Sequence, residues 1–254
     1  MPIEFSFGEV LNELEVIEHL AEPLLEPDDL WKLDVFGGAL KTIRANRVAA
    51  DWSLAESNPL RTRASGEYER LPRHGTYPTV HGEFSAIWQI QPIATAKAAQ
   101  LPAKFTIVGK ASTKLRLVEE DEGRRQEFLL WRMEISAGDS PPGSFFHIQL
   151  GEDLLDSSVY QPLPVPRIPC PPASPFLALE YMLAELFQDA WPQQLTRDVP
   201  STNQWANLQR PRLQSFFGWQ QETLRRRGGS PVTDLKHAIP RQDLLTDTKG
   251  CNLR

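Results

Sequence analysis

Six residues in the middle of the chain combine the side-chain types that phosphate chemistry needs. They are Lys110, Lys114, Arg132, Glu134, His147 and Gln149. Lysine and arginine can hold a phosphate group, and histidine titrates near neutral pH, so His147 could act as a general acid or base beside Glu134. The pattern suggests a phosphodiester hydrolase or nuclease, with His147 and Glu134 as catalytic residues and the other four as ligand-binding residues. Glu134 is the one carboxylate among them, whereas two-metal nucleases generally need more acidic ligands.

These residues fall on segments rich in β-branched and aromatic residues, which predicts strands. The predicted strands span residues 82–91, 104–118, 126–135 and 144–150. Polar connections that contain glycine or proline, at 119–125 and 136–143, predict turns between them. A four-stranded antiparallel meander is therefore expected. Since neighbouring strands lie ~4.8 Å apart, the six side chains would share one patch.

Side chains alternate between the two faces of a strand, so each predicted strand can be divided into an apolar and a polar side. The apolar side, which must be buried, comprises Phe84, Trp88, Ile90, Phe105, Ile107, Leu115, Leu117, Leu129, Trp131, Met133, Ile135, Phe146, Ile148 and Leu150. The candidate site residues belong to the opposite, mixed side. Lysine, arginine, serine and glutamine are also typical of an ordinary solvated sheet face, and this interpretation competes with a binding or catalytic one.

Helices are expected both before and after the sheet along the sequence. Apolar residues recur at four- and three-residue spacing from Val10 to Ala21, which predicts an amphipathic helix over 7–22 that ends before Pro23. A second helix is predicted over 38–55. After the sheet, Ser174 is a favourable N-cap for a strongly apolar helix.

The C-terminal half of the predicted fold has four parts. They are a proline-rich extended strap (161–175), the apolar helix (175–191), a last helix (211–227) and a loosely ordered tail (230–254). We therefore predict an α+β fold, with an antiparallel meander flanked by N-terminal and C-terminal helices. Residues 1–229 would form a single domain, with a helical N-terminal segment (1–55), the sheet (79–150) and helices over 175–227.

Several catalytic and metal-binding motifs are excluded. "GKAST" at 109–113 has Lys104 where a phosphate-binding loop requires its first glycine, and "GDSPP" at 138–142 has Pro142 where a nucleophile elbow requires glycine. The five histidines are scattered, and the two cysteines, Cys170 and Cys251, have no ligands at metal-binding spacing. We expect no cofactor and no metal.

Charge is distributed unevenly along the chain, although the net charge is only −6. Residues 1–34 contain ten acidic residues and a single basic one, Lys32, whereas residues 193–254 contain ten lysines and arginines against five acids. Either the two ends match each other within the fold, or the basic end contacts nucleic acid. The negative net charge favours the first interpretation.

The same composition bears on location and function. No apolar run reaches the ~18 residues of a membrane span, and the acidic N-terminus is unlike a secretory signal, so a cytoplasmic protein without membrane contact is expected. We favour a non-catalytic interaction protein with a protein partner, since no compact catalytic constellation is present. Its binding surface would be the acidic N-terminal helix, the polar sheet face or an aromatic C-terminal segment. That segment comprises Trp205, Phe216, Phe217 and Trp219.

Overall fold

A computed structural model describes residues 3–67, 79–95, 100–121, 124–135, 144–150, 168–172, 174–226 and 229–246. The helices are α1 (Phe7–Ala21), α2 (Trp31–Asn46), α3 (Pro175–Leu186), α4 (Ala190–Arg197), α5 (Val199–Arg226) and α6 (Pro231–Lys236), with 3-10 turns η1 (Glu22–Leu24) and η2 (Pro27–Asp29). The strands are β1 (Glu4–Ser6), β2 (Ala50–Leu54), β3 (Leu60–Arg61), β4 (Thr79–Pro92), β5 (Lys104–Asp121), β6 (Arg124–Ile135), β7 (Phe146–Leu150) and β8 (Ile168–Pro169). The predicted α+β class is confirmed.

The eight strands found among the described residues belong to one antiparallel sheet. Its order is β2-β4-β5-β6-β7-β8, with β1 added to β5 and β3 added to β4. The predicted meander is confirmed as β4 to β7, in which sequential strands pair in turn. The turn predicted over 136–143 and most of the proline-rich strap lie outside the described residues. What the structure describes of the strap includes β8, a two-residue edge strand on β7.

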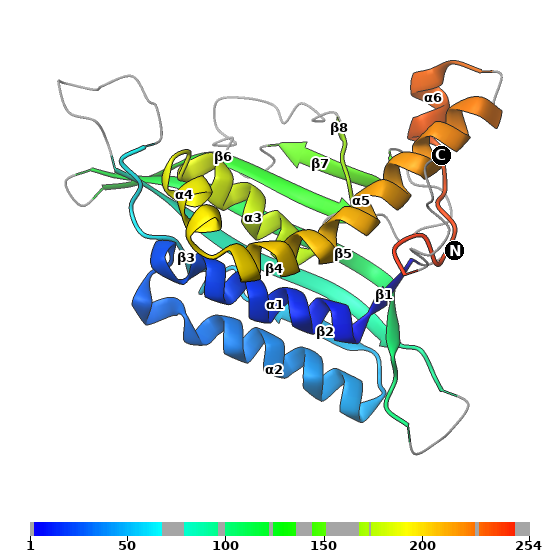
Figure 1. The fold of residues 1–254 in the computed structure, drawn as a ribbon, viewed down its shortest axis with the longest axis horizontal. Coiled ribbons are helices and arrows are strands. Elements are labelled where there is room, and N and C mark those ends of the chain that lie inside the picture. Colours follow the sequence, from blue (N-terminus) through cyan, green and yellow to red (C-terminus); the bar gives the residue numbers. More distant parts are fainter. Residues whose placement is uncertain are drawn as a thin grey trace, which may run out of the picture.

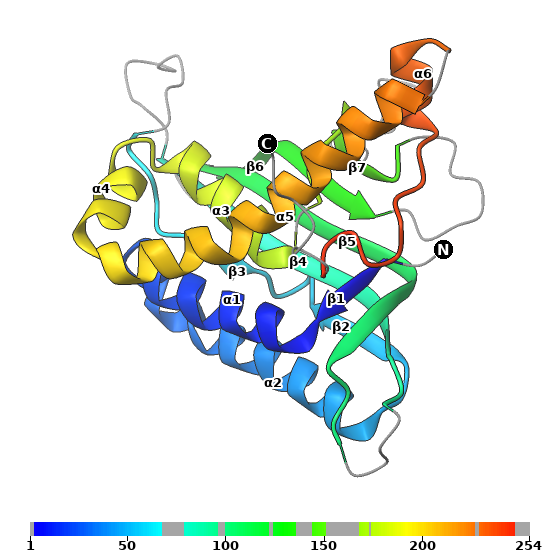
Figure 2. The same ribbon diagram turned by 45° about the vertical axis from the view of Figure 1, so that its right-hand side comes forward.

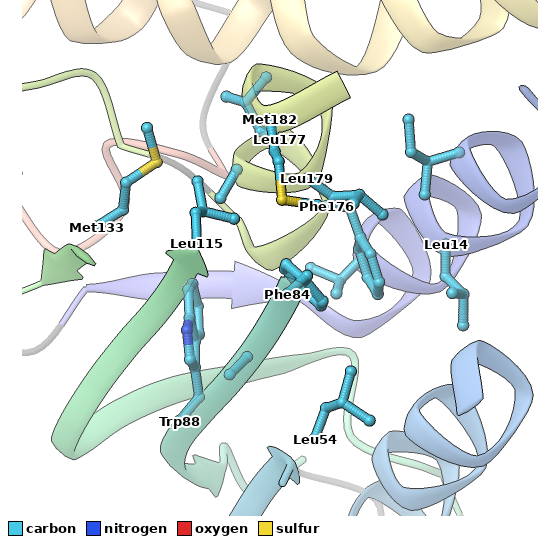
Figure 3. Close-up of a cluster of buried hydrophobic side chains, with 14 of the residues drawn as sticks. Leu14, Leu54, Phe84, Trp88, Leu115, Met133, Phe176, Leu177, Leu179 and Met182 are labelled. Carbon is cyan, nitrogen blue, oxygen red and sulfur yellow. The ribbon is translucent and has the colours of Figure 1, made fainter. Parts of the chain in front are cut away.

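The helices lie on one side of the sheet, with α1 and α2 next to each other and α5 running obliquely across (Figures 1 and 2). Against this side the apolar strand residues pack with α3, as Figure 3 shows for Phe84, Trp88 and Leu115 beneath Phe176 and Met182. All five are buried. The predicted apolar face is thus the core face, because burying it stabilises the fold.

The sequence leaves open how residues 1–55 relate to the sheet. The described part of this segment, residues 3–55, packs on the sheet with its helices and adds β1 and β2 to it. Phe5 of β1 stacks on Phe105 of β5 with ring centroids 5.6 Å apart, and Phe36 of α2 stacks on Trp52 of β2 at 4.4 Å. The Trp52 indole N–H also donates a hydrogen bond to the Phe36 carbonyl oxygen. The N-terminal helices and the sheet therefore share one hydrophobic core.

The helix predicted over 38–55 is wrong at both ends. The helix α2 starts seven residues earlier, at Trp31, and its buried side runs from Leu33 to Ile43. It ends because Arg47 adopts a left-handed conformation with φ of 59°, a conformation that usually belongs to glycine. The chain then enters β2, so Trp52 is a strand residue. No glycine or proline marks this boundary in the sequence.

The C-terminal helices also differ from their predicted bounds. The helix predicted over 175–191 ends at Leu186, and α4 follows as a separate helix. The helix predicted over 211–227 is α5, which begins at Val199 and not near Pro211, because the Asp198 carboxylate accepts a hydrogen bond from the Ser201 N–H and caps its first turn. The helix continues through Pro211.

The C-terminal segment packs against the rest of the fold, and the acidic and basic parts of the chain contact each other. Leu244 and Leu245 are buried, and the Glu4 N–H donates to the Gln242 carbonyl at 2.9 Å. In α5 the buried Arg212 donates to Glu13 and Glu9 of α1. This contact joins the acidic beginning to the basic end of the chain. Within the described residues, no helix has the length and apolarity to cross a bilayer.

Candidate functional site

Five of the six predicted site residues come together on the polar side of the sheet. In the register, Lys114 lies opposite Arg132, Arg132 opposite Gln149, and Glu134 opposite His147. Lys110 lies apart from them, in the irregular part of β5 where the register shifts against β4. It is exposed, and its backbone N–H donates to the Gln89 side chain at 2.9 Å.

Each ring nitrogen of His147 has an oxygen neighbour, and Nδ1 is the one of the two with hydrogen-bond geometry. Its Nδ1 lies 2.9 Å from the Ser144 carbonyl oxygen, and its Nε2 lies 3.2 Å from Glu134 Oε2. Burial alone would raise the pKa of Glu134, but the contact with His147 and the charge of Arg132 outweigh burial and hold this pKa below its ordinary value. Glu134 is therefore an ionised partner of the imidazole at neutral pH.

The cluster is closed to substrate. His147 is 1% exposed and Gln149 6% exposed, so no ligand reaches the imidazole in this conformation. The apolar helix α3 does not cover these residues, since it packs on the opposite, apolar side of β4 and β5. The polar face is thus neither an open catalytic site nor the solvated sheet face that its composition also suggested.

A cleft of about 920 Å³ opens at one end of the same polar side. Its lining residues are Asp28, Asp29, Trp31, Lys32, Glu56, Ser57, Asn58, Pro59, Arg61, Glu83, Arg116, Glu120, Arg125 and Glu127. They come from η2 and the start of α2, from β3 and the turn between β2 and β3, and from the ends of β4, β5 and β6. Glu83 and Arg116 are opposite each other in the β4–β5 register and form part of its floor.

Ion pairs fix the shape of this cleft. Asp29 accepts from Lys32 Nζ at 2.7 Å and from Arg61 Nε at 3.3 Å, which ties the start of α2 to β3. The Lys32 ammonium also donates to the Pro59 carbonyl at 2.7 Å. Because Asp29 and Lys32 are both almost fully buried, this pairing holds the turn between β2 and β3 against α2.

A second group of ion pairs crosses the sheet side of the cleft. Arg125 Nη2 donates to Glu83 Oε2 at 2.5 Å, and Arg116 contacts both Glu56 and Glu127. Burial raises the pKa of Glu83, but His81 and Arg125 lower it more, so the carboxyl stays ionised. The pKa of Asp29 is likewise lowered against the effect of burial, by hydrogen bonds from Lys32 and Arg61.

Trp31 is the exposed apolar feature of the cleft. Its side chain is 53% exposed at the first position of α2, and it is the one aromatic residue among the described residues that line the cleft. A tryptophan left in water costs free energy and is typical of binding surfaces. Sequence reasoning missed this cleft, although "EPDDLWK" places a tryptophan within a charged, turn-forming stretch.

The other two predicted binding surfaces, the acidic N-terminal helix and the aromatic C-terminal segment, are partly buried. In α1, Glu13 is fully buried against Arg212, whereas Glu15 remains exposed. In the aromatic segment, Trp205 and Phe216 are buried and Trp219 packs against the core, which leaves Phe217 at 51% exposure. Among the described residues, no group of three histidine, cysteine or acidic side chains is placed to hold a metal ion.

The fold and the cleft define an α+β protein with helices on one side of an antiparallel sheet and a charged cleft at the end of the other side. Comparison with known proteins gives no matching family model, no similar curated protein and no similar solved structure.

Proposed function

We propose that this chain is a non-catalytic interaction protein that binds another protein through the charged cleft at one end of its sheet. The observation that carries the proposal is the exposed Trp31 at a charge-lined cleft of about 920 Å³. Binding sites of this kind pair an apolar anchor with a few fixed polar groups, and tryptophan is enriched among the residues that dominate binding energy.

The rigidity of the cleft supports the same proposal. Its charged side chains are held by ion pairs between elements that are distant in sequence, such as Asp29 with Arg61 and Glu83 with Arg125. A preformed site loses little conformational entropy on binding, which favours affinity. Catalysis receives less support, since the two histidines that face carboxylates on the polar side within the described residues, His147 beside Glu134 and His81 beside Glu83, are both buried.

Site-specific photo-crosslinking in cells tests the proposal. A photoreactive benzoylphenylalanine replaces Ser57, an exposed residue of the cleft, and in a control chain it replaces Gln221, an exposed residue of α5. We expect a discrete protein adduct at Ser57 that is absent at Gln221 and is lost with Trp31→Ala. The same adducts at both positions, or none at Ser57, would contradict a partner in the cleft.

A phosphodiester hydrolase remains the second candidate, because His147 and Glu134 lie 3.2 Å apart as an acid–base pair requires. The matching experiment measures hydrolysis of bis(p-nitrophenyl) phosphate by the wild type and by His147→Asn. We expect no activity that depends on His147, and finding such an activity would replace the interaction proposal with the enzymatic one.

A further inference from the structure

The charges of the cleft do not balance. Six acidic residues line it against four basic ones, and each of the four basic residues already contacts a carboxylate. Two acids are left over. Among the described residues, no hydrogen bond or ion pair engages the carboxylate of Asp28 or of Glu120, and both side chains are exposed. A ligand that enters the cleft therefore meets unpaired negative charge.

Trp31 adds a second, independent feature that favours a cation. Its exposed indole lines the same cleft as the two unpaired carboxylates, and the face of an indole ring attracts ammonium and guanidinium groups. Guanidinium groups are planar and weakly hydrated, so they stack on aromatic rings and pair with carboxylates at the same time. An anionic ligand has no such match, because it would have to displace Glu56, Glu83 or Asp29 from its cation.

We infer that the cleft accepts an arginine-bearing segment of the partner, whose guanidinium groups stack on the indole of Trp31 and pair with Asp28 and Glu120. This inference rests on the proposed function and specifies its ligand chemistry. The size of the cleft, about 920 Å³, is sufficient for several side chains of an extended peptide.

Asp28 also has a structural role that the test must separate from ligand binding. It lies in the turn before α2, where a negative charge stabilises the positive end of the helix. Each variant is therefore first compared with the wild type in thermal unfolding, and the Glu120→Gln variant, which touches no helix terminus, is measured alone as well as with Asp28→Asn.

The test is titration calorimetry with hexa-arginine, hexa-lysine and hexa-glutamate peptides. The control protein carries Glu15→Gln and Glu22→Gln, which remove the same charge from exposed positions outside the cleft. We expect hexa-arginine to bind more tightly than hexa-lysine, and Asp28→Asn with Glu120→Gln to weaken it about tenfold or more. Trp31→Ala should weaken it about threefold to tenfold and Trp31→Phe less, while the control stays within about twofold of the wild type.

Three results would overturn the inference. They are no measurable hexa-arginine binding, equal or tighter binding of hexa-glutamate, and a control as strongly weakened as the cleft variant, which would indicate attraction by the net charge alone. If one of these accompanies a specific adduct at Ser57, the cleft binds a partner of different chemistry and only this inference fails. If the adduct is also absent, the proposed function fails with it.

Discussion

The contact between Glu13 and Arg212 places two opposite charges inside the protein, and each depends on the other. Burial lowers the pKa of Arg212, but Glu13 and Glu9 raise it more, so the guanidinium stays charged. We predict that Glu13→Gln lowers the free energy of unfolding by about 3 kcal/mol, because it leaves a buried cation with weaker compensation. Urea unfolding followed by circular dichroism measures this change.

The matched control for this prediction is Glu15→Gln on the same helix. Glu15 is exposed, so its replacement should change the free energy of unfolding by less than about 0.5 kcal/mol. A double variant, Glu13→Leu with Arg212→Met, removes both charges and should recover much of the loss. Equal effects of Glu13→Gln and Glu15→Gln would show that the buried ion pair does not matter for stability.

Glu134 and Glu18 should respond to pH with opposite signs. The pKa of Glu134 is lowered in the folded protein, so its ionisation stabilises the fold above the ordinary glutamate pKa, and this contribution is lost as the pH falls through the folded-state value. The pKa of Glu18 is raised by burial and by Asp34, Glu22 and Glu15, so its ionisation costs the folded state stability at neutral pH.

We therefore predict that Glu134→Gln is less stable than the wild type at about pH 7 and that Glu18→Gln is more stable, with both differences shrinking towards about pH 3. Urea unfolding at a series of pH values measures both. Two variants that shift stability in the same direction at neutral pH would contradict the environments described for these carboxyls.

The contact between α3 and the sheet depends on Gly82 of β4. A Cβ atom at this position would lie 2.6 Å from Met182 Sδ and 2.7 Å from Leu186 Cδ1, and both side chains are fully buried. We predict that Gly82→Ala lowers the free energy of unfolding by about 1–2 kcal/mol, since the buried side chains must shift. Gly38→Ala in α2 is the control, because nothing lies within 4 Å of its Cβ position and alanine favours helix by up to about 1 kcal/mol. A Gly82→Ala protein as stable as the wild type would mean that α3 packs less closely than described.

The secondary structure elements differ in how well the sequence predicts them. The meander follows from period-two patterns that are long and rich in β-branched residues, and its core face follows with it. The bounds of α2 and α5 depend on single backbone events instead. Arg47 adopts a left-handed conformation without being glycine, and Pro211 lies inside a helix that Trp205 and Phe216 anchor in the core on both sides. Residue preferences predict neither event, because tertiary packing overrides them.

The cleft was beyond sequence reasoning for a different reason. It joins segments around residues 28–32, 56–61, 83, 116–120 and 125–127, and no local pattern tells which distant segments meet. The burial of His147 is a similar case, since its alternation with Phe146 and Ile148 predicts the face on which it lies but not whether that face is open. The alternation of residues along a strand predicts the sheet face on which a side chain lies. Whether that side chain is exposed depends on how the whole chain folds.

The acidic N-terminal segment is part of the hydrophobic core of the whole molecule. Its role in binding therefore cannot be tested by deleting it. Residues 3–21 supply β1 and α1, in which Phe5 contacts Trp88 at 5.2 Å and Phe7 contacts Phe105 at 4.8 Å between ring centroids. Deleting them would expose a large apolar area of the sheet, and free energy of burial is the main favourable contribution to folding.

We predict that a chain lacking residues 1–21 loses cooperative thermal unfolding and its near-ultraviolet circular dichroism and binds the dye ANS, as a loosely packed state does. The full-length Glu15→Gln and Glu22→Gln protein should keep all three properties of the wild type, because both side chains are exposed. This double variant therefore removes acidic surface charge but keeps the core intact. If the variant still binds the partner, Glu15 and Glu22 are not the residues that contact the partner. A truncated chain with a native near-ultraviolet spectrum would contradict the placement of α1 in the core.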